Sequence, residues 1–192
     1  NAGNVILASG TPLAASNFGA SVGGENLLRN SSFELDSNAD GRADEWGSYG
    51  AGTFGERTYS RITSGYVTHG TYAQRVSASE LAAGAGNRVG VSQSIPTAVH
   101  VGKPWRCFAS VGATSGRTIR LFVSHRDGSN AEISSNGTVV ITGNGGQQFI
   151  ESGGTIPSGT VNTIVWVWVA DGTGAAALLN IDAVQFQIGD VQ

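Results

Sequence analysis

The sequence predicts an all-β fold, a sandwich or a barrel, in a single domain. Short strand-like runs recur about ten times after residue 26, with turn residues between them, as in sandwiches and barrels. The chain of 192 residues contains 29 glycines and only 13% charged residues, a composition that suits strands joined by tight turns. No segment carries a sustained apolar stripe of helical period. The nearest, "ASELAAGAG" at 78–86, contains glycines that favour a loop or one helical turn.

The expected elements begin after an N-terminal arm. Residues 1–25 are small, rich in Gly, Ala and Ser and broken by Pro12, so they are expected to form an arm or linker in which only "NVIL" resembles a strand. The β-sandwich domain is expected over 26–192. Its strand-like runs are 32–36, 57–62, 72–78, 89–95, 105–113, 117–125, 137–142, 147–152, 162–170 and 178–188.

The run "NTIVWVWVA" at 162–170 has two apolar faces. Side chains alternate along a strand, so its valines project to one side while Ile164, Trp166 and Trp168 project to the other. The strand is therefore either covered on both faces, or it turns one face to a core and presents aromatic rings to a ligand.

Charge and cysteine content exclude several classes of protein. The net charge of −3 leaves no basic footprint, so nucleic acid is not expected as a partner. No apolar stretch reaches the roughly 18 residues of a membrane span, so membrane insertion is not expected. The one cysteine, Cys107, lies in an apolar run and is expected to be a buried thiol. The chain opens on Asn and contains no Met, which suggests a processed product or a piece of a longer polypeptide.

Motifs at the two ends of the sandwich region resemble a known family. "NLLRNSSFELD" at 26–36, "DEWG" at 44–47 and "NIDAVQFQIG" at 180–189 are similar to carbohydrate-binding modules of families 4, 9 and 22, in the galactose-binding-like superfamily. The resemblance implies a jelly roll whose opening and closing strands are adjacent, and a non-catalytic sugar-binding role. It also implies a structural calcium held by Glu34 and Asp182. The sequence departs from the family with Ala183 in place of a second Asp and Gln74 in place of an apolar residue.

A second calcium site is a candidate at "DSNADGRADEW", residues 36–46. Calcium takes six to eight oxygen ligands, and alternating acidic and amide side chains before a glycine are typical of calcium loops. The candidate ligands are Asp36, Asn38, Asp40, the carbonyl of Arg42, and Asp44 or Glu45. An EF-hand loop requires a bidentate Glu at its twelfth position. Counted from Asp36, that position is Gly47, which excludes an EF-hand. The alternatives are a shorter calcium loop or an acidic turn whose side chains satisfy the backbone. Either ion would be structural.

Sugar binding requires flat aromatic faces together with polar groups that pair with hydroxyls. The aromatic candidates are Trp46, Tyr49, Tyr59, Tyr66, Tyr72, Trp105, Trp166 and Trp168, although for any single one a core position is the stronger alternative. Trp166 and Trp168 form the best pair because they share a strand face. Tyr59 and Tyr66 could rim the same cleft, and Arg120 and His125 are expected as polar partners. Trp46 is expected in the core.

Catalysis is not expected. The three histidines, His69, His100 and His125, are scattered without metal-ligand spacing. The sequence contains no Gly-x-Ser-x-Gly elbow, and its glycine-rich stretches lack the Lys-Ser/Thr of a phosphate loop.

The expected function is therefore a carbohydrate-binding domain of a larger extracellular protein, stabilised by calcium. The alternative is an assembly or receptor-binding domain of a phage tail spike, fibre or other virion protein, which could form a homotrimer. The small, flexible arm and the low charge favour that alternative. The expected location is accordingly extracellular or at a virion surface.

Overall fold

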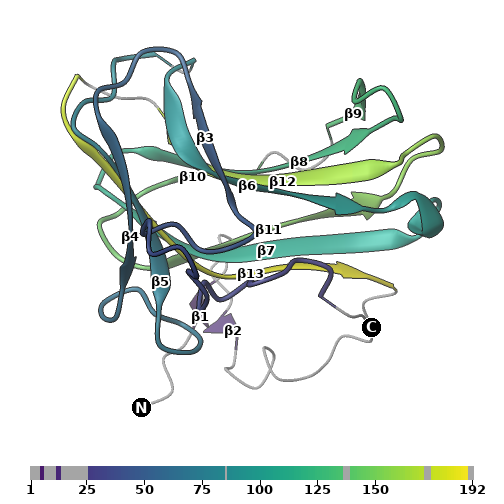
Figure 1. Cartoon of the computed structure of the whole chain (residues 1–192), viewed down its shortest axis with the longest axis horizontal. Coiled ribbons are helices and arrows are strands. Elements are labelled where there is room, and N and C mark those ends of the chain that lie inside the picture. The colour runs from purple at the N-terminus through teal and green to yellow at the C-terminus, as the bar shows by residue number, and fades with distance from the viewer. Residues whose placement is uncertain are drawn as a thin grey trace.

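The chain forms a β-sandwich jelly roll of two antiparallel sheets packed face to face (Figure 1). The structure, a computed structural model, describes residues 5–6, 12–13, 26–84, 86–135, 139–170 and 174–189. The predicted fold class is confirmed. Most of the expected N-terminal arm lies outside the described residues; within it, β1 (Val5–Ile6) and β2 (Pro12–Leu13) pair antiparallel. Among the described residues, no helix has the length and apolar character needed to cross a bilayer.

The two sheets have clear strand orders. The first sheet runs β10 (Val139–Thr142), β8 (Thr118–Arg126), β12 (Asn162–Ala170), β6 (Arg88–Pro96) and β3 (Gly47–Ala51), with β9 (Glu132–Ser134) beside β8. The second sheet runs β11 (Gln148–Thr155), β7 (Pro104–Ala113), β13 (Ala177–Ile188), β5 (Ala73–Ala78) and β4 (Arg57–Ile62). A 3-10 turn, η2 (Ala98–His100), joins β6 to β7.

The core lies between the sheets and follows the alternation of the strands. The valines of β12 at 165, 167 and 169 are fully buried against the second sheet, so the predicted division of this strand into two faces is confirmed. Cys107 on β7 is also fully buried, which confirms the expected buried thiol, and burial raises its pKa. Trp46 lies in the core as well, with its ring centroid 5.0 Å from that of Phe33.

The opening motif is adjacent to the closing strand, as the resemblance implies. The N–H of Leu27 donates to the carbonyl of Phe186 at 2.9 Å, and Asn26 forms a β-bridge with Gln187. The predicted strand at 32–36, however, is wrong, because that segment is irregular.

The irregular path of the opening segment is fixed by Asn30. Its side-chain amide donates to the carbonyls of Leu35 and Asp44, at 2.8 and 3.0 Å, and its Oδ1 accepts the N–H of Leu35. Its own carbonyl accepts the indole N–H of Trp46 at 3.0 Å. Because these bonds satisfy backbone groups that a strand would pair in a ladder, the segment folds as a loop over the end of the sandwich.

Candidate functional site

Four aromatic side chains gather on the outer face of the first sheet. Trp166 and Trp168 come from β12, Phe122 from β8 and Tyr49 from β3. The Phe122 ring centroid lies 5.3 Å from Trp166 and 5.4 Å from Trp168, and that of Tyr49 lies 6.1 and 5.5 Å from the same two rings. These separations are typical of interacting aromatic pairs. We refer to these four residues as the aromatic face.

The register of the sheet explains how residues of three strands meet. Trp166 lies directly opposite Phe122, and Trp168 lies opposite Gly90 of β6, which in turn lies opposite Tyr49. A Cβ on Gly90 would overlap the carbonyl of Val167 and lie 2.6 Å from the Cα of Trp168. The absence of a side chain on β6 therefore lets Tyr49 reach across that strand to the two tryptophans.

The two tryptophans share a face, as predicted, but they differ in exposure. Trp168 is only 3% exposed, because Tyr49 and Phe122 pack against it and the guanidinium of Arg88 lies 5.2 Å from its ring centroid. Trp166 is partly exposed. Trp168 is thus a supporting residue rather than an open stacking surface, and Trp166 is the tryptophan that a ligand can reach.

Three arginines surround the aromatic face. Arg88 of β6 lies over Tyr49 and Trp168, at 5.5 and 5.2 Å, and Arg126 of β8 lies over Trp166 at 5.7 Å. Arg120 lies directly opposite Trp168 in the register. The predicted site contained Arg120 and omitted Phe122, Arg88 and Arg126. Alternation along 118–126 places Arg120, Phe122 and Arg126 on one face and could have identified two of the three.

His125 does not belong to this face, which corrects the expected role in sugar binding. It is 0% exposed and projects from β8 into the core. Its Nδ1 lies 2.9 Å from the hydroxyl of Thr163, and its ring meets Trp105 edge-on at 5.6 Å. Burial lowers the pKa of its imidazole.

Tyr59 and Tyr66 also lie away from the aromatic face. Tyr59 projects from β4 against the core, and its hydroxyl donates to the carbonyl of Gly90 at 3.3 Å; burial raises its pKa. Tyr66 lies over Gly112 of the second sheet, and its hydroxyl donates to the carbonyl of Gly145 at 2.7 Å. The structure therefore does not bring these tyrosines to a cleft with Trp166.

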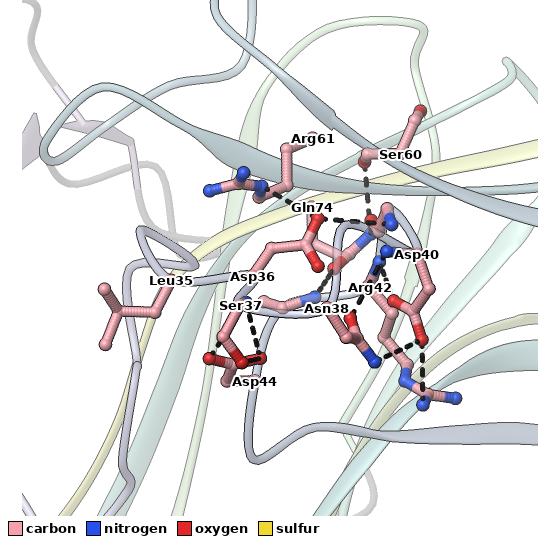
Figure 2. Close-up of polar contacts among 12 residues, drawn as sticks. Leu35, Asp36, Ser37, Asn38, Asp40, Arg42, Asp44, Ser60, Arg61 and Gln74 are labelled. Carbon is pink, nitrogen blue, oxygen red and sulfur yellow. Dashed lines mark hydrogen bonds and ion pairs between the residues drawn. The ribbon is translucent and has the colours of Figure 1, made fainter.

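The acidic loop at 36–46 is held by many internal polar contacts (Figure 2). Asp36 Oδ2 accepts the N–H of Gly41 at 3.2 Å and lies 3.4 Å from Nε of Arg61. Asp44 Oδ1 accepts the N–H of Ser37 at 3.0 Å. The second oxygen of Asp36, Oδ1, is buried and has no hydrogen-bond partner among the described residues.

The middle of the loop consists of two Asx turns. Asn38 Oδ1 accepts the N–H of Asp40 at 3.2 Å, and Asp40 Oδ1 accepts the N–H of Arg42 at 2.8 Å. The bond from Arg42 lowers the pKa of Asp40. Across the described ranges, no three His, Cys, Asp or Glu side chains come together in a way that could hold a metal ion.

Gln74 attaches this loop to the second sheet, a role that the sequence did not indicate. Its Oε1 accepts the N–H of Ala43 at 2.8 Å, and its Nε2 donates to the carbonyls of Gly41 and Ser60 at 3.0 and 3.1 Å. Gln74 is fully buried. The polar residue at a position where the family has an apolar one is therefore explained by the loop that it holds.

Glu34 and Asp182 meet on one segment, 68–72. Two N–H groups of this segment donate to Asp182 Oδ2, and two others donate to Glu34 Oε1 at 2.9 and 3.0 Å. Asp182 is fully buried, and burial raises its pKa despite these bonds. Two residues separated by most of the sequence are thus joined through the same loop.

Comparison with known proteins finds similarity in fold. No protein-family model matches the sequence, and no curated protein matches it either. Among solved structures, the chain is similar to the TmCBM61 module in complex with β-1,4-galactotriose (TM-score 0.59, 18% identity, covering 84% of this chain and 97% of that one). It is also similar to the CBM22-1 xylan-binding domain of Paenibacillus barcinonensis Xyn10C (TM-score 0.56, 16% identity, 88% and 97%).

A third similar structure is the enzymatically active domain of tailspike protein 4 of bacteriophage CBA120. The TM-score is 0.64 at 13% identity, over 85% of this chain. The chain spans only 21% of that tailspike chain. At such identities the three similarities establish a shared fold, so the resemblance to the β-sandwich of carbohydrate-binding modules is confirmed at the level of architecture.

Proposed function

We propose that the chain is a non-catalytic carbohydrate-binding domain of a larger extracellular protein, and that the aromatic face is its binding surface. One observation carries the proposal: four aromatic rings and three arginines gather on an outer sheet face, where a core-forming role does not account for them. The shared fold with carbohydrate-binding modules supports it.

The chemistry of the face suits a sugar chain. The apolar face of a pyranose ring stacks on the accessible part of Trp166, while Phe122 and Tyr49 border it on either side. The arginine N–H groups and the Tyr49 hydroxyl supply donors to sugar oxygens. Trp168 packs against Tyr49 and Phe122 and holds both rings in place. The rigid strands keep this arrangement preformed, which lowers the entropy cost of binding.

Binding to a panel of immobilised polysaccharides and bacterial surface glycans tests the proposal. Trp166→Ala is expected to weaken binding by about 2 kcal/mol, about thirtyfold in Kd, because a central aromatic contact is lost. Tyr66→Ala is the matched control, since it removes a partly exposed aromatic ring from the second sheet. Equal loss in both variants, or binding by the parent to no glycan, would contradict the proposal.

We also propose a structural calcium at Glu34 and Asp182. The fit rests on the buried Asp182 carboxylate, whose ionised form a divalent cation would stabilise, and on the approach of Glu34 to the same segment. The ion would supply positive charge and fix segment 68–72 to the closing strand. Calcium is expected to raise Tm in the parent relative to chelator, and Glu34→Gln is expected to abolish this increment. Glu151→Gln, at an exposed ion pair of the second sheet, should retain it.

The acidic loop remains a second candidate for calcium, through Asp36, Asn38, Asp40, Asp44 and the carbonyl of Arg42. The unpartnered oxygen of Asp36 favours a cation there, whereas Arg61 already provides a positive charge beside the same carboxylate. A calcium-dependent Tm that survives Glu34→Gln but is lost in Asp36→Asn would assign the ion to this loop.

The second candidate function is an assembly or receptor-binding domain of a phage tail spike or related virion protein. The similarity to the CBA120 tailspike domain favours it. Light scattering distinguishes the two proposals in their simplest forms, because obligate assembly predicts a trimer and a sugar-binding module predicts a monomer. A trimer in which Trp166→Ala restores the monomer would assign the aromatic face to an interface.

A further inference from the structure

We propose that the aromatic face selects acidic glycans, and specifically sugar chains that carry carboxylate groups such as uronic acids. This inference rests on the proposed function and goes beyond it by naming the charge class of the ligand. Its basis is a concentration of cationic, incompletely paired arginines around the aromatic rings.

The charge of the aromatic face is opposite to that of the whole chain. The net charge of the protein is −3. Among the described strand positions on the outer face of the first sheet, however, the charged side chains are three arginines and one carboxylate. These are Arg88, Arg120, Arg126 and Glu132. A ligand that lies on this face meets a locally positive surface that attracts anions even though the protein is acidic.

The hydrogen-bonding capacity of these arginines is largely unused. Arg126 pairs with Glu132 at 3.4 Å and donates to the carbonyl of Asn130 at 3.2 Å, whereas the side chains of Arg88 and Arg120 form no ion pair or hydrogen bond with any part of the chain that the structure describes. The Nε atoms of all three arginines are buried without a partner among the described residues, as is Nε1 of Trp168. These buried Nε atoms are not the groups that a ligand contacts, but the three arginines are partly exposed, so a carboxylate on the face can pair with their terminal N–H groups.

The stacking of the arginines orients their donors. Arg88 is held over Tyr49 and Trp168, so its planar guanidinium is pre-positioned and loses little freedom when it binds a carboxylate. A planar guanidinium can pair with a carboxylate through two parallel hydrogen bonds, which a neutral hydroxyl cannot match in strength. This geometry favours a carboxylate over a neutral sugar.

The spacing of the arginines suits a chain of several sugars. Arg120 and Arg126 are six positions apart on β8, which corresponds to about 20 Å along an extended strand. Arg88 is two strands away from β8, about 10 Å across the sheet. Trp166 lies between these positions in the register. An acidic polysaccharide stacked on Trp166 can therefore reach more than one arginine.

A matched pair of polymers tests the inference: polygalacturonate, and the same polymer after its carboxylates are reduced to hydroxymethyl groups. The parent chain is expected to bind the acidic form about tenfold or more tightly at low salt, and to lose much of that preference at high salt. Arg88→Gln and Arg120→Gln should each weaken binding to the acidic polymer about tenfold, and should weaken binding to the reduced polymer much less, because the glutamine amide still donates hydrogen bonds to hydroxyls.

Arg106→Gln is the matched control, because it removes one positive charge from the second sheet, where Arg106 pairs with Glu151. It should bind both polymers like the parent. Arg120→Lys retains the charge without the planar guanidinium, and its affinity for the acidic polymer is expected to lie between those of the parent and Arg120→Gln. Circular dichroism and Tm establish that each variant is folded before binding is compared.

The outcomes separate this inference from the proposed function. Equal binding to the two polymers, weakened by Trp166→Ala, would overturn the acidic selectivity and retain sugar binding. Binding to neither polymer, nor to any member of the glycan panel, would overturn both proposals. Binding of poly-glutamate as tight as that of polygalacturonate would overturn the sugar selectivity and make the face a surface for acidic peptides.

Discussion

Buried polar side chains organise this sandwich at the level of single residues. Gln74, His125 and Asp182 are fully buried, yet each forms hydrogen bonds that connect separate elements. Buried polar groups that find partners specify one arrangement of the chain, and the same groups are costly once a partner is lost. Gln74 and Asp182 thereby fix two loops to strands of the second sheet.

Replacement of Gln74 by leucine, an apolar residue of similar size, tests this view. The change leaves the N–H of Ala43 and the carbonyls of Gly41 and Ser60 without their partner, so the free energy of unfolding is expected to fall by about 3 kcal/mol. Denaturant unfolding measures the loss. Gln187→Leu serves as the control, since among the described residues the Gln187 side chain forms one hydrogen bond, to the side chain of Gln185; an equally large loss there would contradict the assigned role.

His125 is expected to make stability depend on pH. Burial lowers its pKa below the ordinary value of 6.5, so below that pH the unfolded chain binds a proton that the folded chain resists. The free energy of unfolding should therefore fall as pH decreases through about 6.5 and level off above it. Denaturation between pH 5 and 8 should show this slope in the parent and a weaker one in His125→Gln; an unchanged slope in that variant would contradict the role of His125.

At the level of elements, strands that follow simple alternation could be predicted from the sequence. The runs 57–62 and 162–170 match β4 and β12 in full, because apolar and β-branched residues mark both. Strand β3 was not predicted, since its sequence "GSYGA" has little strand propensity and its pairing with β6 forms it. The segment 32–36 was predicted as a strand and is a loop, because the side chain of Asn30 binds its backbone.

The candidate site was predictable only in part, because alternation within one strand does not show which strands lie beside it. Alternation within β12 placed Trp166 and Trp168 on one face. The neighbours of that pair come from β3, β6 and β8, and strand order in a sheet cannot be obtained from local patterns. His125 was expected among the ligand-binding residues. It follows Val123 by two positions on β8, so alternation along the strand places both side chains on the core side.

Gly90→Val is predicted to disturb the aromatic face through β6. A side chain at this position would overlap the carbonyl of Val167 and the backbone of Trp168, so the free energy of unfolding should fall by about 3 kcal/mol. The near-ultraviolet circular dichroism of the tryptophans should change as well. Ser94→Val, at an exposed position of β6 opposite Ile164 rather than a tryptophan, is the control and should preserve both; a stable, spectrally unchanged Gly90→Val protein would contradict the assigned packing.

At the level of the whole molecule, the two sheets have different outer faces. The first sheet carries the aromatic face and its arginines, whereas Arg106 on the outer side of the second sheet is already paired with Glu151. The acidic loop and the segment 68–72 lie at strand ends, where they fix connections between elements. Stability and ligand binding are therefore assigned to different parts of the sandwich.

The four tryptophans provide the most direct measurement of where a ligand binds. Trp46 and Trp105 lie in the core, whereas Trp166 and Trp168 lie on the aromatic face. In an ¹⁵N-labelled sample, titration with a glycan fragment that binds should shift the indole N–H signals of Trp166 and Trp168 and leave those of Trp46 and Trp105 in place. Shifts confined to Trp105, or to backbone signals of the second sheet, would contradict the proposed binding surface.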